Sequence, residues 1–221
     1  MSKLDKDFKN AISQLSSVEK DKLIFRLLRK YPDVVDKLQF ELVSKDSKED
    51  RREEAKKQIQ KIYIDMTIAR VKYSTPGMLM MDMRDASGIV NKHTKTTDDK
   101  YGEIYLHIFI MKEYLKMYNN HFIDSSAQQT NNFNLYCISK ILKIMVLLKK
   151  MHEDVQFDFA EDIKEIGNLF NCNPNLRELA TKKGFYINWL TEYKIPENIT
   201  EIEKKIKQTE QIKGSKFLYI R

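Results

Sequence analysis

The sequence has few of the residues that build turn-rich sheets or disulfide-linked domains. Glycine occurs 6 times and proline 4 times in 221 residues. Such a composition favours helices over turn-rich β structure. The 2 cysteines, Cys137 and Cys172, form neither a CxxC pair nor a disulfide framework, so a zinc ribbon and a disulfide scaffold are disfavoured. We expect both cysteines to be reduced thiols.

Long apolar runs are also missing. After Lys140, the longest uncharged run of the most apolar segment covers only residues 144–148, far short of the roughly 20 residues that a membrane helix requires. The opening residues MSKLDKDFKN lack the apolar centre of a secretory signal peptide. The absence of GxSxG, P-loop and Rossmann glycine motifs disfavours nucleophilic hydrolases, P-loop NTPases and dinucleotide enzymes. We therefore expect a cytoplasmic protein.

What the sequence does contain is apolar side chains at helical spacing. Residues 133–151 are apolar on nearly every face of a helix and leave Lys140, Lys143 and two further lysines for water. Because a helix this apolar must be surrounded by others, we expect it at the centre, with residues 103–118 as its antiparallel partner. The sequence thus predicts an all-α protein, a single irregular helical bundle of about seven to nine helices around these two.

The remaining segments predict how the chain is divided. Residues 1–44 predict a compact N-terminal helical layer, and residues 46–192 predict the main bundle, so that one helical domain covers residues 1–192. Residues 193–221 predict a charged helix followed by a tail.

Two polar stretches inside the main bundle interrupt the apolar periodicity. Residues 91–102 (NKHTKTTDDKYG) and 119–132 (NNHFIDSSAQQTNN) are rich in residues that favour turns. We expect both to be loops. The second is the longer and is predicted to be a mobile surface loop.

The net charge of +7 originates in the middle of the chain. Residues 51–150 contain 17 Lys and Arg against 10 Asp and Glu, whereas the charges of the flanking parts cancel. This surplus favours a polyanionic partner such as RNA, DNA or a triphosphate, and the candidate contacts are Arg51, Arg52, Lys56, Lys140 and Lys143. The alternative is an ordinary charged surface, because the sequence has no Arg-rich run and no aromatic–basic repeat.

Two pairs of acidic residues could hold a metal ion. Each pair has i, i+3 spacing, which places both carboxylates on one face of a predicted helix. If the two helices are antiparallel and the pairs converge, their oxygens would bind Mg²⁺ and leave positions for water and phosphates. The candidate ligands are Asp50, Glu53, Asp82 and Asp85.

The same acids also have a structural explanation. Asp50 and Glu53 would then be solvated helix charges, and the later pair would form ion pairs with Arg70 or Arg84. His107, four residues after Glu103 on an apolar helix, is in the same way more typical of a hydrogen-bonded core histidine than of a metal ligand.

The carboxylate pattern resembles that of the all-α nucleoside triphosphate pyrophosphohydrolases over about residues 46–150. The segments STPGMLMMDMRD, DDKYGEI, KKMHED and NWL…IPENI also resemble uncharacterised bacterial helical proteins sometimes labelled deoxyuridine triphosphate nucleotidohydrolase. This chain departs from the pyrophosphohydrolase motif in having Asp at positions 50 and 82. The resemblance implies Mg²⁺-dependent release of pyrophosphate from a nucleotide.

Two functions therefore follow from the sequence. The first is a non-catalytic protein that acts through its surfaces on a protein or RNA partner and needs no cofactor. The second is a Mg²⁺-dependent pyrophosphohydrolase similar to the all-α dUTPases. We favour the first because the chain has no complete catalytic set.

Overall fold

The computed structural model describes residues 5–70 and 74–213, and this part of the chain contains twelve α-helices and no strand. The predicted all-α class is confirmed. The predicted number of seven to nine helices is too low, in part because α8 and α11 are short helices that periodicity does not reveal. The helices are α1 Lys6–Gln14, α2 Ser17–Leu28, α3 Pro32–Leu42, α4 Lys48–Asp65, α5 Pro76–Thr97, α6 Lys100–His121, α7 Ala127–Leu148, α8 Glu153–Asp158, α9 Ala160–Cys172, α10 Pro174–Lys182, α11 Asn188–Thr191 and α12 Ile199–Lys213, with a π-helical turn over Met66–Arg70 after α4.

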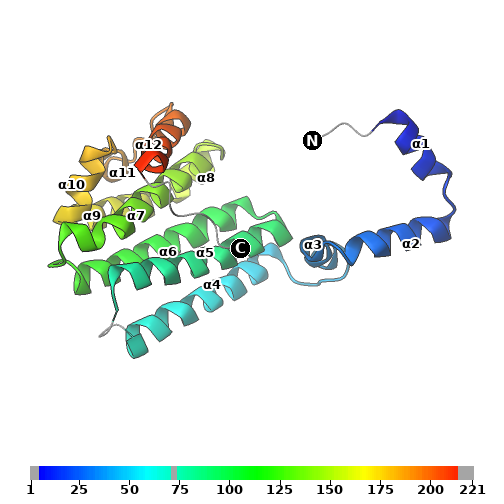
Figure 1. Cartoon of the computed structure of the whole chain (residues 1–221), viewed down its shortest axis with the longest axis horizontal. Coiled ribbons are helices and arrows are strands. Elements are labelled where there is room, and N and C mark those ends of the chain that lie inside the picture. Colours follow the sequence, from blue (N-terminus) through cyan, green and yellow to red (C-terminus); the bar gives the residue numbers. More distant parts are fainter. Residues whose placement is uncertain (1–4, 71–73, 214–221) are drawn as a thin grey trace.

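The core is built around α5, α6 and α7, as predicted for the two apolar helices α6 and α7. Helix α6 lies against α5, α7 and α9, while α7 also contacts α10 and α12 (Figure 1). Both helices bury large side chains completely, among them Tyr114, Tyr118 and Phe133. No described helix is long and apolar enough to cross a membrane.

Helices that end and begin at short, capped turns replace most of both predicted loops. Helix α5 runs on to Thr97, Asp98 turns the chain with a φ of 51°, and the Asp99 side chain accepts from the Gly102 amide to start α6. The loop predicted over residues 91–102 is therefore wrong. Most of the loop predicted over residues 119–132 is helix as well, because Ser126 forms a capping box that starts α7.

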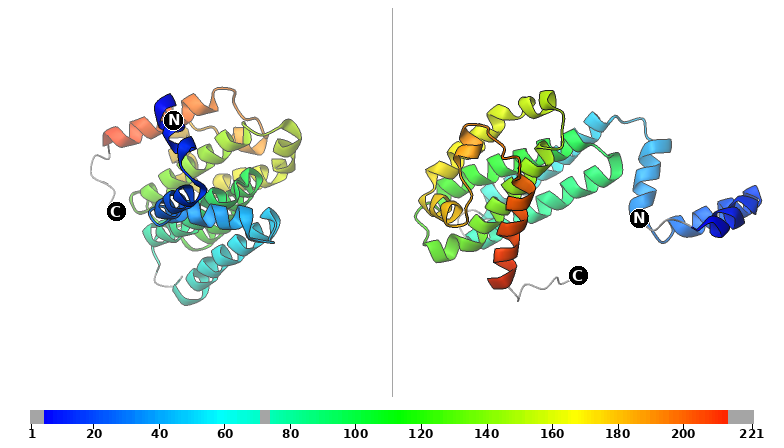
Figure 2. Two further views of the ribbon diagram at one scale, coloured as in Figure 1. Left: turned by 90° about the vertical axis from the view of Figure 1, so that its right-hand side faces the viewer. Right: turned by 90° about the horizontal axis from the view of Figure 1, so that it is seen from above.

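The described part of the predicted N-terminal layer, residues 5–44, does not form a compact layer. Helices α1, α2 and α3 bury no residue, and only α3 packs against the bundle, along α5. Figures 1 and 2 show α1 and α2 extending away from the bundle. We call residues 5–31, which comprise α1, α2 and the turn to α3, the N-terminal arm.

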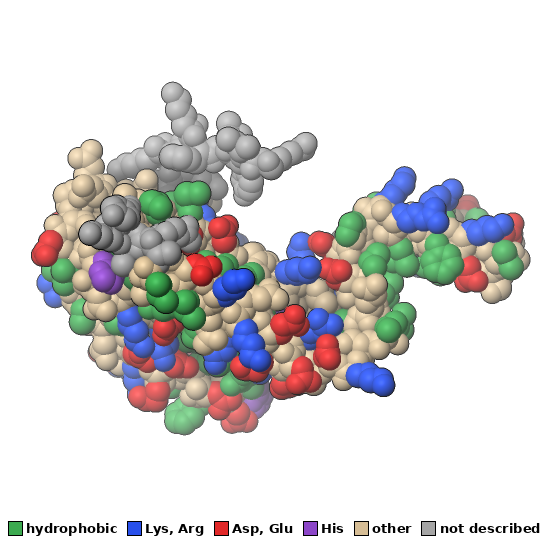
Figure 3. All heavy atoms as spheres, turned by 90° about the horizontal axis from the view of Figure 1, so that it is seen from below, with side chains coloured by type: hydrophobic (Ala, Val, Ile, Leu, Met, Phe, Trp, Pro, Cys, Tyr) green, Lys and Arg blue, Asp and Glu red, His purple; other side chains and the backbone are tan. Residues whose placement is uncertain are grey.

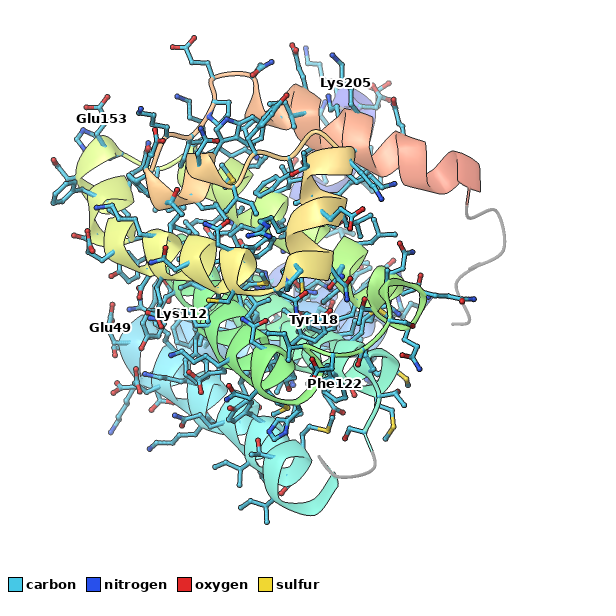
Figure 4. All side chains as sticks on the ribbon, turned by 90° about the vertical axis from the view of Figure 1, so that its left-hand side faces the viewer. Glu49, Lys112, Tyr118, Phe122, Glu153 and Lys205 are labelled. Carbon is cyan, nitrogen blue, oxygen red and sulfur yellow. The ribbon has the colours of Figure 1, made fainter. Side chains whose placement is uncertain are left out.

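The C-terminal part completes the bundle. Helix α12 packs on α7 and buries Ile199 and Ile206, so the predicted charged helix is in contact with the core. The predicted tail over residues 214–221 lies outside the described residues. On α6, Lys112, which is labelled in Figure 4, forms an ion pair with Asp162 of α9 at 2.7 Å.

Because the core is buried and the arm is exposed, we expect replacement of a large side chain by Ala to change the free energy of unfolding differently in the two. Ile144→Ala is expected to lower the free energy of unfolding by about 2–5 kcal/mol, because it leaves a cavity in the core. Phe25→Ala, in the 60% exposed position of the arm, is expected to change it by less than about 0.5 kcal/mol. Urea unfolding at low protein concentration, monitored by circular dichroism, measures the free energy of unfolding of both variants. Equal losses in the two variants would contradict this description.

Candidate functional site

Six of the sixteen exposed large apolar side chains among the described residues lie on the N-terminal arm. These six residues are between 47% and 61% exposed. On α2, Ile24 and Leu27 lie at i, i+3 on one side of the helix, and Val18 and Phe25 lie at i, i+7 on another. Figure 3 shows hydrophobic side chains along the arm, beside a row of Lys and Arg. Apolar patches of this kind mark interaction sites in soluble proteins. The six residues, which we call the exposed apolar residues of the arm, are Phe8, Val18, Ile24, Phe25, Leu27 and Tyr31.

A cleft lies between α3, α4 and α5. Its volume of about 750 Å³ is within the range of small-molecule sites. Phe40, Val43 and Ile89 contribute apolar surface. Two of the charged side chains that line the cleft, Lys92 and Asp36, form an ion pair with each other at 3.3 Å. The cleft therefore offers a mixed surface with no obvious charge preference.

A buried ion-pair cluster shares His93 with the lining of the cleft. The Asp99 carboxylate is 2.9 Å from Nε of Arg52 and 3.1 Å from Nε2 of His93. Burial raises the pKa of Asp99, but the hydrogen bonds from His93, Arg52 and the Gly102 amide outweigh it and hold this pKa well below its usual range. A Cβ at Gly102 would lie 2.1 Å from the Asp99 carboxylate, so only glycine fits. The cluster joins α4 to the turn between α5 and α6.

The four predicted metal ligands have different surroundings. Asp50 accepts from the amide and hydroxyl of Ser47 in the capping box of α4, and the hydrogen bond from that amide lowers its pKa. Glu53 is exposed to solvent. On α5, Asp82 is 8% exposed, whereas Asp85 is exposed and lines the cleft.

The structure does not bring the two acidic pairs together. Because Arg52 bonds to Asp99, the first pair lies beside the end of α5. Asp85 and Asp82 precede that end by three helical turns or more. Because an α-helix rises 1.5 Å per residue, the two pairs are on the order of 20 Å apart along α5. Carboxylates bind Mg²⁺ at about 2 Å and cannot share one ion across this gap. Within residues 5–70 and 74–213, no three His, Cys, Asp or Glu side chains form a group suited to a metal.

All five predicted polyanion contacts interact with groups of the chain itself. The Lys56 ammonium donates to the Tyr105 hydroxyl and lies 5.4 Å from the centre of the Phe109 ring. Lys143 is 3.1 Å from the Glu103 carboxylate and 3.0 Å from Nε2 of His107. The other partners are Asp46 and Glu54 for Arg51, Asp99 and Glu49 for Arg52, and the Ser87 hydroxyl for Lys140.

Lys140 is buried, which corrects its predicted exposure to water. Its ammonium donates to the Ser87 hydroxyl at 2.7 Å, and the residue is 7% exposed. Burial lowers its pKa to about 7, and the charge of Lys143 adds to this effect. Nearby, burial holds the pKa of His107 well below its ordinary value, so this histidine is neutral and hydrogen-bonded, as predicted. The sequence pattern gave no sign of a buried lysine.

We expect Lys140→Met to stabilise the protein at neutral and acidic pH. Because the unfolded lysine has a pKa near 10.4, the unfolded chain binds more protons between about pH 7 and 10 than the folded chain does. The contribution of Lys140 to the free energy of unfolding therefore rises with pH over that window and is lowest below pH 7. The variant should gain about 1–3 kcal/mol at pH 6 and little at pH 10. Exposed Lys149→Met is the control, and a variant less stable at pH 6 would contradict the assignment.

Millimolar Mg²⁺ is expected to leave the melting temperature unchanged. Ion binding to the folded state alone would raise this temperature, but the acidic pairs are too far apart to form one site. Differential scanning fluorimetry with and without EDTA provides the measurement. A rise of several degrees that disappears in both Asp50→Asn and Asp85→Asn would contradict the geometry described above.

Comparison of the chain with protein-family models, with curated proteins and with solved structures found no match. The resemblance to the all-α pyrophosphohydrolases thus stays a prediction.

Proposed function

We propose that this protein works without catalysis, as a cytoplasmic binding protein whose N-terminal arm docks on another protein. The exposed apolar residues of the arm carry this proposal. Phe25 and Leu27 lie 60% and 47% exposed on a helix that buries nothing within the chain. Contact between these apolar side chains and water is unfavourable by about 25 cal/mol per Å² of apolar surface. A partner protein that covers the surface removes this unfavourable free energy.

A protein partner fits the arm better than RNA does. Helices α1 and α2 present apolar side chains at i, i+3 and i+4 spacing, the pattern by which a helix enters a groove of another protein. Aromatic side chains such as Phe8, Phe25 and Tyr31 are also the residues that most often dominate protein interfaces. The basic residues predicted to meet RNA have intramolecular partners instead, which reduces their value as phosphate contacts.

The enzyme alternative has less support from the geometry. Its four acidic residues lie at two separate places on α4 and α5, and the cleft contains only Asp85 of them. The two cysteines agree with a cytoplasmic location, since Cys137 is a buried free thiol and Cys172 an exposed one.

Photo-crosslinking in cells tests the proposal. A photoreactive amino acid at position 25 of the arm is expected to capture a discrete protein, whereas the same amino acid at Phe157, an exposed aromatic of α8, is not. The captured protein is then purified and its affinity measured by calorimetry. Phe25→Asp combined with Leu27→Asp should weaken binding at least tenfold, because two interface anchors become charged.

Phe157→Asp is the matched control, since it places the same charge at a 76% exposed aromatic of the bundle. A partner that binds the arm variant as tightly as the unaltered protein would overturn the role of the arm. Nucleotide turnover that requires Mg²⁺ and is abolished by a single substitution would overturn the non-catalytic function.

A further inference from the structure

We propose that the cleft between α3, α4 and α5 binds a small organic cation, that is, an ammonium or guanidinium group attached to an apolar body. This inference goes beyond the proposed function and does not depend on it, since no residue of the arm lines the cleft. Three observations carry it, namely the shape of the cleft, an open glycine in its floor and one carboxylate that forms no ion pair.

Three helices each present one stripe of side chains to the cleft. On α5 this stripe consists of Asp85, Gly88, Ile89 and Lys92, whose i, i+3, i+4 and i+7 spacing places them on one side of the helix. Helices α3 and α4 contribute residues at the same spacing. Both helices pack on α5, and Figure 1 shows α3 end-on beside α4 and α5. The space of about 750 Å³ between the three stripes is large enough for a drug-sized molecule.

Gly88 opens the floor of the cleft. It is an exposed residue in the interior of α5, where glycine is less favourable for the helix than alanine. A Cβ at this position would meet no neighbouring group of the described residues within 4 Å, so packing inside the chain does not require glycine here. Glycine permits a close approach to the helix from outside. We therefore place the apolar body of the ligand over Gly88, where Ile89 and Phe40 supply apolar surface.

The charges along the cleft determine the sign of the ligand. Over most of the cleft they cancel, because one ion pair joins α3 to α5 and Arg51 lies 3.3 Å from the Glu54 carboxylate. His93 is bonded to Asp99. Asp85 differs from these groups, since its side chain is exposed, lines the cleft and forms no ion pair with any residue that the structure describes. A cationic ligand would pair with this carboxylate, whereas an anionic ligand would be repelled.

The spacing of Asp85 and Gly88 defines how the ligand is built. Positions i and i+3 of a helix are neighbours on its surface, with about 5–6 Å between them. A cationic group beside Asp85 and an apolar body over Gly88 are therefore joined by a short alkyl chain. The site fits phenylalkylamines and molecules of similar shape.

Three probes with the same apolar body test the site. The compounds 4-phenylbutylamine, 4-phenylbutanol and 4-phenylbutyrate differ in whether their end group is cationic, neutral or anionic. Titration calorimetry of the full chain at low ionic strength measures their affinities. The amine should bind about three- to fivefold more tightly than the alcohol, the range expected of an exposed ion pair, and the acid should bind most weakly. Asp85→Asn should lower the affinity for the amine to that for the alcohol.

Two further variants separate the site from general effects of substitution. Gly88→Leu should weaken the binding of all three probes at least tenfold, because its side chain fills the floor of the cleft. The open space around position 88 accommodates leucine, so the melting temperature of this variant should not fall. Glu53→Gln removes a charge from an exposed residue of α4 that does not line the cleft, and it should leave the affinities unchanged.

Each contrary result overturns a defined part of the proposal. If no probe binds the unaltered chain at millimolar concentration, the cleft is not a site for such molecules. Equal affinities for the three probes, or an affinity for the amine that Asp85→Asn does not change, would contradict the preference for a cation. Binding that survives Gly88→Leu would place the site elsewhere on the molecule.

Discussion

Burial of an almost uniformly apolar helix is the constraint on which the structure depends. Helix α7 carries apolar side chains on faces that point in every direction, so it is stable only when other helices surround it. Helices α5, α6, α10 and α12 supply that cover. Helices α1, α2 and α3 add no buried residue to the core, whereas α4 adds Ala55 and Ile59.

The arm lies outside the core of the chain. Its helices α1 and α2 have an amphipathic pattern, but they bury no residue. Phe8 and Tyr31 are accordingly left about half exposed. An amphipathic helix without a place in its own core needs a second protein surface, which connects the packing of the bundle to the proposed binding function.

The sequence predicted the fold better than the site, for physical reasons. The all-α class and the central helices followed from periodicity, which reports directly on burial. Loops were predicted at residues 91–102 because polar side chains there look like a turn, yet His93 and Asp99 are polar residues buried in an ion-pair cluster. Local pattern also placed Lys140 in water, whereas its exposure depends on how α5 packs against α7. Exposure of the arm could not be predicted either, because periodicity shows which face is apolar but not whether another element covers it.

Hydrogen exchange with and without the captured partner tests the central claim that the arm is an uncovered binding surface. In dilute solution of the chain alone, the amides of residues 6–28 should exchange far faster than those of α7, because their helices have no tertiary cover. Binding of the partner should slow the arm amides selectively and leave α7 unchanged. Arm amides as protected as those of α7 in dilute monomer would contradict the account, since the arm would then be packed within its own chain.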